Sequence, residues 1–161
     1  MTAIDNHRIT VSDYASNDQY TSTGGVFPGD AFMGNTITIP GPFSDVEGRQ
    51  EQNLGALEQA DNFIEVPGQS TLHGVTEAYQ AAVITQNTGF TADPATDEDV
   101  QNPSSIYSRA HQDATPQTIP ITETITNDAS GNPIRVDYSV KKPGETPLIL
   151  KLFSNSYYED N

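Results

Sequence analysis

The sequence predicts a mainly β fold of the α+β type, with a small antiparallel sheet at the C-terminus, one helix and a long extended N-terminal arm. Three observations predict it: alternating apolar and polar residues after residue 118, one stretch of sustained helical periodicity, and 43 N-terminal residues punctuated by Gly and Pro. Apolar residues are only 34% of the 161, against about 45–50% in globular domains when Gly is counted with them. We therefore expect a single domain with a thin hydrophobic core.

Residues 1–43 are expected to form the arm, because Gly24-Gly25 and Pro40-Gly41-Pro42 interrupt any regular pattern there. Within the arm, Asn35–Ile39 alternates polar and apolar residues and predicts one short strand closed by Pro40. The aromatic residues of the arm are spaced too widely to form a core among themselves, and we take them as candidate interaction residues: Tyr14, Tyr20, Phe27, Phe32 and Phe43. They either anchor the arm on a neighbouring surface or fold back on the chain's own core, and the sequence leaves both open.

Residues 44–161 are expected to form the small β-rich domain. Its first feature is a capping-box pattern at Ser44 and Glu47, which predicts a short or broken helix near 51–61. The stronger prediction is a helix over about 70–87, where apolar residues recur at helical spacing and Gly89 stands just past the end.

Residues 90–116 predict a long acidic loop, because they contain three prolines and the cluster Asp97-Glu98-Asp99. The segment that follows, 118–154, carries the clearest strand pattern. Ile119–Thr126 and Ile134–Val140 both alternate, and the turn-forming residues between them predict a hairpin.

The parity of the apolar positions limits the hairpin register to Ile125 opposite Val136 or Ile125 opposite Ile134. We prefer the first register, because it places Glu123 opposite Tyr138, whose hydroxyl can serve a carboxylate on the apolar face. A third strand at 148–153 completes an antiparallel meander, and its apolar residues on both faces predict that it is the most buried strand.

The charge balance excludes several classes of partner. There are 22 acidic and 7 basic residues, and the formal net charge is −15. Such a chain repels nucleic acid and anionic lipid, so neither is expected as a partner. The Cys count of zero excludes disulfides, thiolate metal sites and a Cys nucleophile. The N-terminal residues show no signal-peptide pattern, which predicts synthesis in the cytoplasm of the producing cell.

Catalytic and metal-binding motifs are weak in this chain. His7, His73 and His111 show no His-x-x-x-His or His-x-His spacing, so a transition-metal site is not expected and no cofactor is predicted. The best metal candidate is a calcium site on the acidic loop, formed by Asp93, Asp97, Glu98 and Asp99, although a solvated acidic loop explains the same residues. Without a nucleophile elbow or phosphate-binding loop, no catalytic residue is proposed and the protein is expected not to be an enzyme.

In general character the chain resembles the small decoration, cement or minor capsid proteins of tailed viruses. The resemblance is carried by the Thr-, Asn- and Gln-rich arm around Thr21-Ser22-Thr23-Gly24-Gly25 and by the Thr-rich C-terminal hairpin. It implies a non-enzymatic virion structural protein that forms homo-oligomers and contacts the major capsid protein or other virion subunits. The charge of −15 then favours the outer capsid surface, away from packaged DNA.

Two alternatives remain at the level of sequence. One is a carbohydrate- or host-binding module of a tail, baseplate or cell surface, which shares the β-rich fold. The other is a small hydrolase, which requires converging carboxylates. The low lysine count, with only Lys141, Lys142 and Lys151, also supports the hypothesis of adaptation to high salt.

Overall fold

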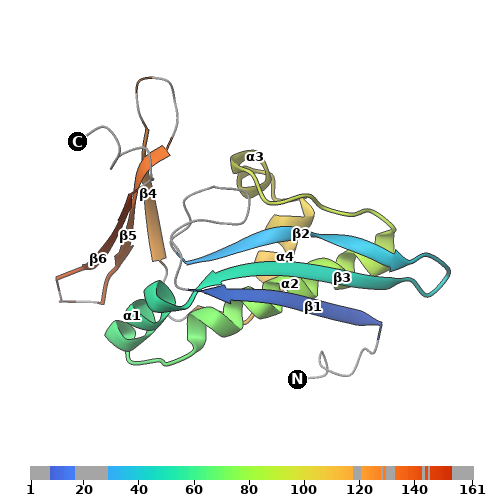
Figure 1. Cartoon of the computed structure of the whole chain (residues 1–161), viewed down its shortest axis with the longest axis horizontal. Coiled ribbons are helices and arrows are strands. Elements are labelled where there is room, and N and C mark those ends of the chain that lie inside the picture. Colours follow the sequence, from blue (N-terminus) through green and yellow to red (C-terminus); the bar gives the residue numbers. More distant parts are fainter. Residues whose placement is uncertain are drawn as a thin grey trace. The chain divides into compact units, whose positions relative to one another are not determined.

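The computed structural model describes residues 8–16, 29–117, 121–127, 129, 133–142, 144 and 146–153. Within them the chain forms six strands and four helices (Figure 1). In chain order these are β1 (Ile9–Ser16), β2 (Asp30–Ile39), β3 (Asp45–Asn53), α1 (Leu54–Ile64), α2 (Gln69–Thr88), α3 (Asp97–Gln101), α4 (Ile106–Asp113), β4 (Ile121–Asn127), β5 (Pro133–Val140) and β6 (Leu148–Phe153).

The fold is α+β with two three-stranded sheets, so the prediction of a mainly β fold with one helix and an extended N-terminal arm is wrong. Two compact units make up the chain. The first comprises Met1–Tyr14, Ala31–Glu51 and Leu72–Pro116, and the second Ala15–Asp30, Gln52–Thr71 and Gln117–Asn161. Both β3 and α2 pass from one unit into the other.

The first sheet has the strand order β1-β3-β2. β1 and β3 run in the same direction and β2 runs against them (Figure 1). The amide of Val46 donates to the carbonyl of Arg8 at 2.9 Å, which joins β3 to the segment that leads into β1. Residues expected in the arm therefore supply two of the three strands. The predicted strand Asn35–Ile39 is the second half of β2, which ends before Pro40 as expected.

β3 replaces the helix start that the capping-box pattern at Ser44 and Glu47 predicts. The Ser44 hydroxyl instead donates to the carbonyl of Gly41 at 2.9 Å, within the turn that leads from β2 to β3. Along the strand Val46, Gly48, Gln50 and Gln52 are all buried. Burial thus alternates with a period of two from Asp45 to Gln50, and every residue from Gln50 to Asn53 is buried. The sequence of this strand is too polar to show the alternation in hydropathy.

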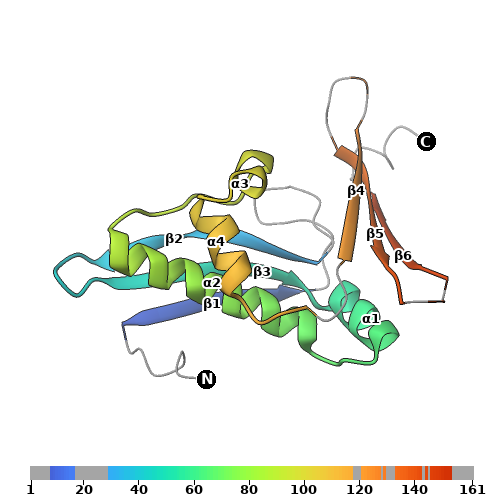
Figure 2. The same cartoon turned by 180° about the vertical axis from the view of Figure 1, so that it is seen from behind.

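Helix α2 confirms the prediction of a helix over 70–87, and Gly89 ends it with φ of 76°. Helices α2 and α4 cover one face of the first sheet (Figure 2). The main cluster of buried hydrophobic residues that the structure describes in this unit is small, as expected from the composition, and consists of Phe32, Ala78, Ala81, Ile84 and Ala110.

The expectation of one long loop over 90–116 is wrong, because this segment contains α3 and α4. Thr96 caps α3 in a capping box with Asp99, and Ser105 caps α4 by accepting from the amide of Ser108 at 2.9 Å. Pro94 and Pro103 precede these helices rather than interrupting them. The prolines therefore separate short helices.

In the second unit α1 begins one residue after Asn53, whose side-chain oxygen accepts from the amide of Ala56 at 3.1 Å. A helix near 51–61 was predicted, and α1 starts and ends about three residues later. The buried carboxylate of Asp61 accepts from the Ser70 amide at 3.1 Å and from its hydroxyl at 2.6 Å, which fastens the start of α2 to α1.

The second sheet is the predicted antiparallel meander, with order β4-β5-β6. Its register is the preferred one, with Ile125 opposite Val136 and Glu123 opposite Tyr138. Ala60 and Ile64 of α1 form a core cluster with Val140, against which Phe63 and Leu148 pack. Ile149 is 51% exposed, so β6 is not buried on both faces at this position.

Candidate metal centre

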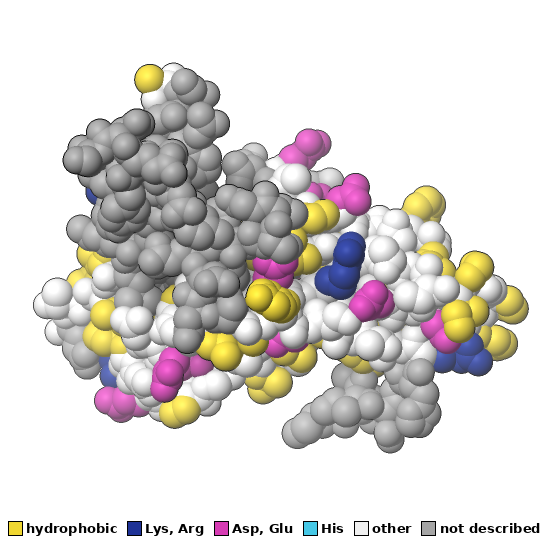
Figure 3. Space-filling view, viewed as in Figure 1, with side chains coloured by type: hydrophobic (Ala, Val, Ile, Leu, Met, Phe, Trp, Pro, Cys, Tyr) yellow, Lys and Arg dark blue, Asp and Glu magenta, His cyan; other side chains and the backbone are white. Residues whose placement is uncertain are grey.

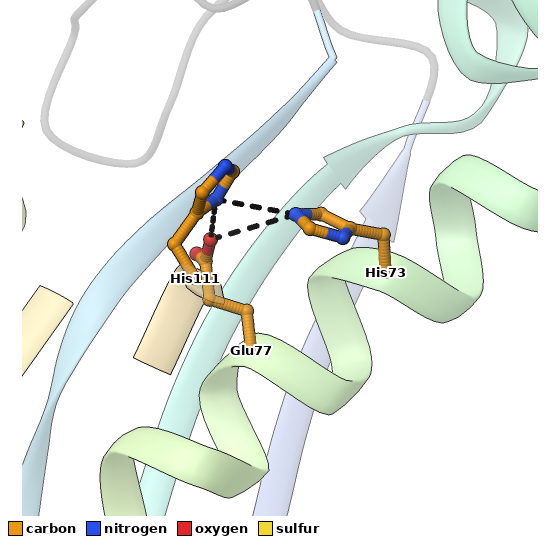
Figure 4. Close-up of side chains that lie close together, drawn as sticks. All are labelled: His73, Glu77 and His111. Carbon is orange, nitrogen blue, oxygen red and sulfur yellow. Dashed lines mark hydrogen bonds and ion pairs between the residues drawn. The ribbon is translucent and has the colours of Figure 1, made fainter. Parts of the chain in front are cut away.

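Three side chains that are far apart in the sequence converge in the first unit: His73 and Glu77 on α2, and His111 on α4 (Figure 4). In the described part of the chain, these are the side chains of His, Cys, Asp or Glu that lie close enough together, as a group of three, to hold a metal ion. Their ligand atoms all lie within 4.8 Å of one another.

His73 and Glu77 share one face of α2 because residues four apart in a helix lie one turn above the other. Both side chains are 5% exposed. This face of the helix also carries Ala81, which is fully buried. The sequence therefore presents an imidazole and a carboxylate in adjacent turns, directed to the interior of the unit.

His111 reaches the pair from α4, whose position depends on small and aromatic residues. Ala110 is fully buried in the core cluster. The Tyr107 ring stacks on the His111 ring, with ring centroids 5.8 Å apart. Tyr107 also contacts the core residue Phe32, and the centroids of these two rings are 6.2 Å apart. His111 is thus held on one side by a ring that rests on the core, while 48% of its side chain stays exposed to solvent.

The three ligand atoms form a compact triangle. His111 Nδ1 lies 2.6 Å from Glu77 Oε2 and 3.2 Å from His73 Nε2, and His73 Nε2 lies 3.8 Å from Glu77 Oε2. Tetrahedral ligands about 2.0–2.1 Å from a zinc ion are separated by roughly 3.3 Å. The three separations bracket that value, so small side-chain adjustments suffice to surround an ion.

The protonation of His73 suits a ligand. Its Nδ1 lies 2.7 Å from the carbonyl oxygen of Thr115, which only accepts, so Nδ1 carries the proton and donates. The Nε2 lone pair is then directed at the other two groups. A metal-binding histidine usually donates its second ring nitrogen to a carbonyl or carboxylate in this way.

The ligand types select the class of metal. Two imidazoles and one carboxylate suit Zn²⁺ and other first-row transition ions, whereas Ca²⁺ prefers oxygen ligands throughout. Three protein ligands also leave one tetrahedral position for water or another donor, and the exposed side of His111 faces solvent.

The residues predicted as a calcium site do not take part in this cluster. Asp99 Oδ2 accepts from the Thr96 amide at 3.0 Å and from its hydroxyl at 2.7 Å, as the cap of α3. Asp93 and Glu98 are exposed, and the side chain of Asp97 lies outside the described residues.

The candidate interaction residues separate into three groups. Tyr14 and Phe43 are 63% and 70% exposed. Phe32 is 3% exposed in the core, so it cannot be an interaction residue, and the alternative of folding back on the chain's own core applies to it. Tyr20 and Phe27 lie outside the described residues.

The expectation that no histidines pair is wrong, since His73 and His111 are 3.2 Å apart at their nearest nitrogens. The available signal was His73-x-x-x-Glu77, a helical i, i+4 pair of potential ligands within the predicted helix. The spacings His-x-x-x-His and His-x-His include no carboxylate ligand, and the prolines of 90–116 predict a loop where α4 positions His111.

Comparisons with known proteins add no family assignment: no family model, curated protein sequence or solved structure matches this chain. Among the described residues, no helix combines the length and apolar character needed to cross a bilayer.

Proposed function

We propose that this protein binds one divalent transition-metal ion, Zn²⁺ in the first instance, through His73 Nε2, Glu77 Oε2 and His111 Nδ1. The observation that carries the proposal is the triangle of ligand atoms, with sides of 2.6, 3.2 and 3.8 Å. The side chains of His73 and Glu77 are almost completely buried, so the cluster belongs to the interior of the unit and is not a chance meeting of surface side chains.

A proton and a metal ion compete for the centre of this triangle. Without metal, the Nδ1 proton of His111 lies between two acceptors, Glu77 Oε2 and His73 Nε2, and is shared unequally between them. A cation that replaces this proton is bound by all three groups at once. Metal binding at Nδ1 therefore requires this proton to move to Nε2 of His111, or to leave to solvent where the ring is doubly protonated. Protons compete with the ion for its ligand atoms, so binding is weakened at low pH.

The bound ion supplies two properties. It would join α2 to α4 in a unit whose main described hydrophobic cluster has five buried residues, three of them alanines. With three protein ligands, a tetrahedral ion would also keep one coordination position for water or a donor atom of another molecule.

The test is a zinc titration of the metal-free chain in competition with a chromophoric chelator, followed by the absorption spectrum of the Co²⁺ form. We expect one ion per chain and the intense visible bands of four-coordinate Co²⁺. His111→Ala removes a half-exposed ligand and should weaken binding at least tenfold. Gln112→Ala is the matched control on the adjacent exposed position, and His7→Ala controls for binding at the N-terminus. Wild-type affinity in His111→Ala overturns the proposal.

We propose as a second, compatible function a non-enzymatic role in assembly, as a homo-oligomeric component of the outer shell of a virion. The supporting observation is a set of exposed apolar side chains where β2 turns into β3: Ile39 at 58%, Phe43 at 70% and, at the end of α2, Phe90 at 73%. Gln86 of α2 donates to the carbonyl of Ser44 at 2.7 Å, so these two segments are joined. Figure 3 shows hydrophobic side chains gathered at this hairpin end.

The test of assembly is sedimentation of the purified chain over a range of concentrations and salt. Because two chains at −15 repel each other, we expect self-association that strengthens as salt screens the charge. Phe43→Ser with Phe90→Ser should abolish it. Leu72→Ser with Val100→Ser, which alters two apolar residues that are 50% and 59% exposed, is the control. A monomer under all conditions contradicts this role.

A further inference from the structure

The metal centre is connected to a closed set of hydrogen bonds that begins and ends at His73. The His73 ring donates from Nδ1 to the carbonyl of Thr115 at 2.7 Å. The amide of the same Thr115 donates to the hydroxyl oxygen of Thr76 at 2.9 Å. The Thr76 hydroxyl in turn lies 2.8 Å from the carbonyl of Leu72 and 3.0 Å from that of His73 itself.

We infer that Thr76 is a positioning residue for the metal centre: its hydroxyl holds Thr115 where that carbonyl fixes the tautomer and orientation of His73. Thr76 touches none of the three ligand atoms in this arrangement and acts through Thr115. The consequence for metal affinity rests on the proposed function, whereas the consequence for the His73 tautomer does not.

Two features of the geometry support this role. A threonine in a helix commonly bonds the carbonyl three or four residues before it, and here the same oxygen has a lone pair left to accept from Thr115. Thr115 is also four residues after His111 and follows directly on Ala114, the buried cap of α4. The Thr76 hydroxyl therefore fastens the end of α4, which carries His111, to the turn of α2 that carries His73.

The tautomer matters because only one form of neutral His73 can bind an ion in the triangle. With the proton on Nδ1, the Nε2 lone pair is directed at His111 and Glu77. If Thr115 moves away, the Nε2–H form gains population, and its proton occupies the position of the metal. Loss of such an outer hydrogen bond typically lowers metal affinity about 10–100-fold.

The experiment compares Thr76→Val, which keeps the shape of the side chain and removes the hydroxyl, with Thr76→Ser, which restores it. Thr88→Val is a matched control, because the Thr88 hydroxyl donates to the carbonyl of Ile84 at 2.8 Å on the same helix and contacts no ligand. We expect zinc affinity to fall about 10–100-fold in Thr76→Val and to return to within about threefold of wild type in Thr76→Ser. Thr88→Val should bind as wild type does.

The second measurement uses the metal-free chain and ¹⁵N spectra of the histidine rings. We expect a protonated Nδ1 and an unprotonated Nε2 in wild-type His73, and a mixture of tautomers in Thr76→Val. A wild-type Nε2–H tautomer, or wild-type zinc affinity in a folded Thr76→Val, overturns the inference. If wild type binds no zinc but Thr76→Val shifts His73 from the expected tautomer to a mixture, the proposed function fails while the positioning role of Thr76 stands. An unchanged tautomer in a folded Thr76→Val overturns that role.

Discussion

Gly48 of β3 lies directly against the backbone of Ala78 of α2: a Cβ at Gly48 would overlap the Ala78 carbonyl oxygen and lie 3.0 Å from its carbonyl carbon. The neighbouring face of α2 is also built of small residues, with Ala78, Ala81 and Ala82 fully buried. Strand β3 and helix α2 therefore pack backbone against backbone at this point. This close packing takes the place of contacts between large apolar side chains, of which the chain has few.

This contact predicts that Gly48→Ala is destabilising. The added methyl group meets helix backbone, which cannot rotate away as a flexible side chain can, so α2 must shift. We expect the free energy of unfolding to fall by about 1–3 kcal/mol, measured by urea denaturation. Arg49→Ala, at the next and exposed position of β3, is the control and should change it by less than about 0.5 kcal/mol. Equal stability of the two variants contradicts the close contact.

The sequence predicted best the elements whose burial is visible in hydropathy. β4 and β5 alternate in the ordinary way, and parity limits their register to two choices, of which the observed one pairs Ile125 with Val136. β6 is recognised by its apolar residues. β3 was missed because its inward positions include Gln50 and Gln52, which are 1% and 0% exposed yet polar. Because glutamine is usually exposed in proteins, the hydropathy pattern places these two positions on the surface.

The metal centre was missed for a related reason. His73 and Glu77 lie in the predicted helix, so two of the three candidate ligands can be recognised from their i, i+4 spacing. His111 joins them only because α4 folds back on α2. This brings His111 into contact with Glu77, 34 residues earlier in the sequence. Nothing local records that contact, since it depends on Ala110 and Tyr107 packing in the core.

Zinc binding predicts a rise in thermal stability. An ion that binds only the folded chain adds about 2.7 kcal/mol at a free concentration 100 times its dissociation constant. For a chain of this size the midpoint should rise by roughly 5–10 °C. Differential scanning calorimetry with zinc or with a chelator measures the shift. In His111→Ala, with affinity at least tenfold lower, the same zinc concentration should raise the midpoint by at most about half as much. An equal rise there would place the ion elsewhere.

Asn35 of β2 is hydrogen-bonded to Thr85 of α2 and to Ala92, which follows that helix. We therefore expect Asn35 to contribute measurably to the free energy of unfolding. Its side-chain oxygen accepts from the Thr85 hydroxyl at 2.9 Å and from the Ala92 amide at 3.1 Å, and the residue is 2% exposed. Asn35→Ala leaves both donors without that acceptor, which should cost about 1–3 kcal/mol of the free energy of unfolding. Thr36→Ala, at the next and exposed position, is the control.

A double-mutant cycle isolates the bond between Asn35 and Thr85. Thr85→Val should cost less in the Asn35→Ala background than in wild type, because the acceptor is already gone. We expect a coupling of at least about 0.5 kcal/mol from urea denaturation of the four chains. Strict additivity would show that the two side chains do not exchange this hydrogen bond in solution.

The capping box of α3 predicts a pH dependence with a definite sign. Hydrogen bonds from the Thr96 side chain and backbone lower the pKa of Asp99 below its ordinary value of 3.8. A group whose pKa is lower in the folded state than in the unfolded state stabilises the fold. This contribution is complete at a pH above the unfolded-state pKa and is lost as the pH falls through the folded-state pKa. The order of α3 should therefore be constant from neutral pH down to about 5 and decline below about 4.

The measurement is a ¹³C titration of the Asp99 carboxyl group, with amide exchange along α3 recorded at each pH. Thr96→Ala removes the hydroxyl donor, so the pKa of Asp99 should move up toward its ordinary value. Asp99→Asn keeps an oxygen that can accept from Thr96 and has no carboxyl to titrate, so α3 should lose its acid dependence. If Asp99 titrates at or above 3.8 in wild type, the capping box does not persist in solution.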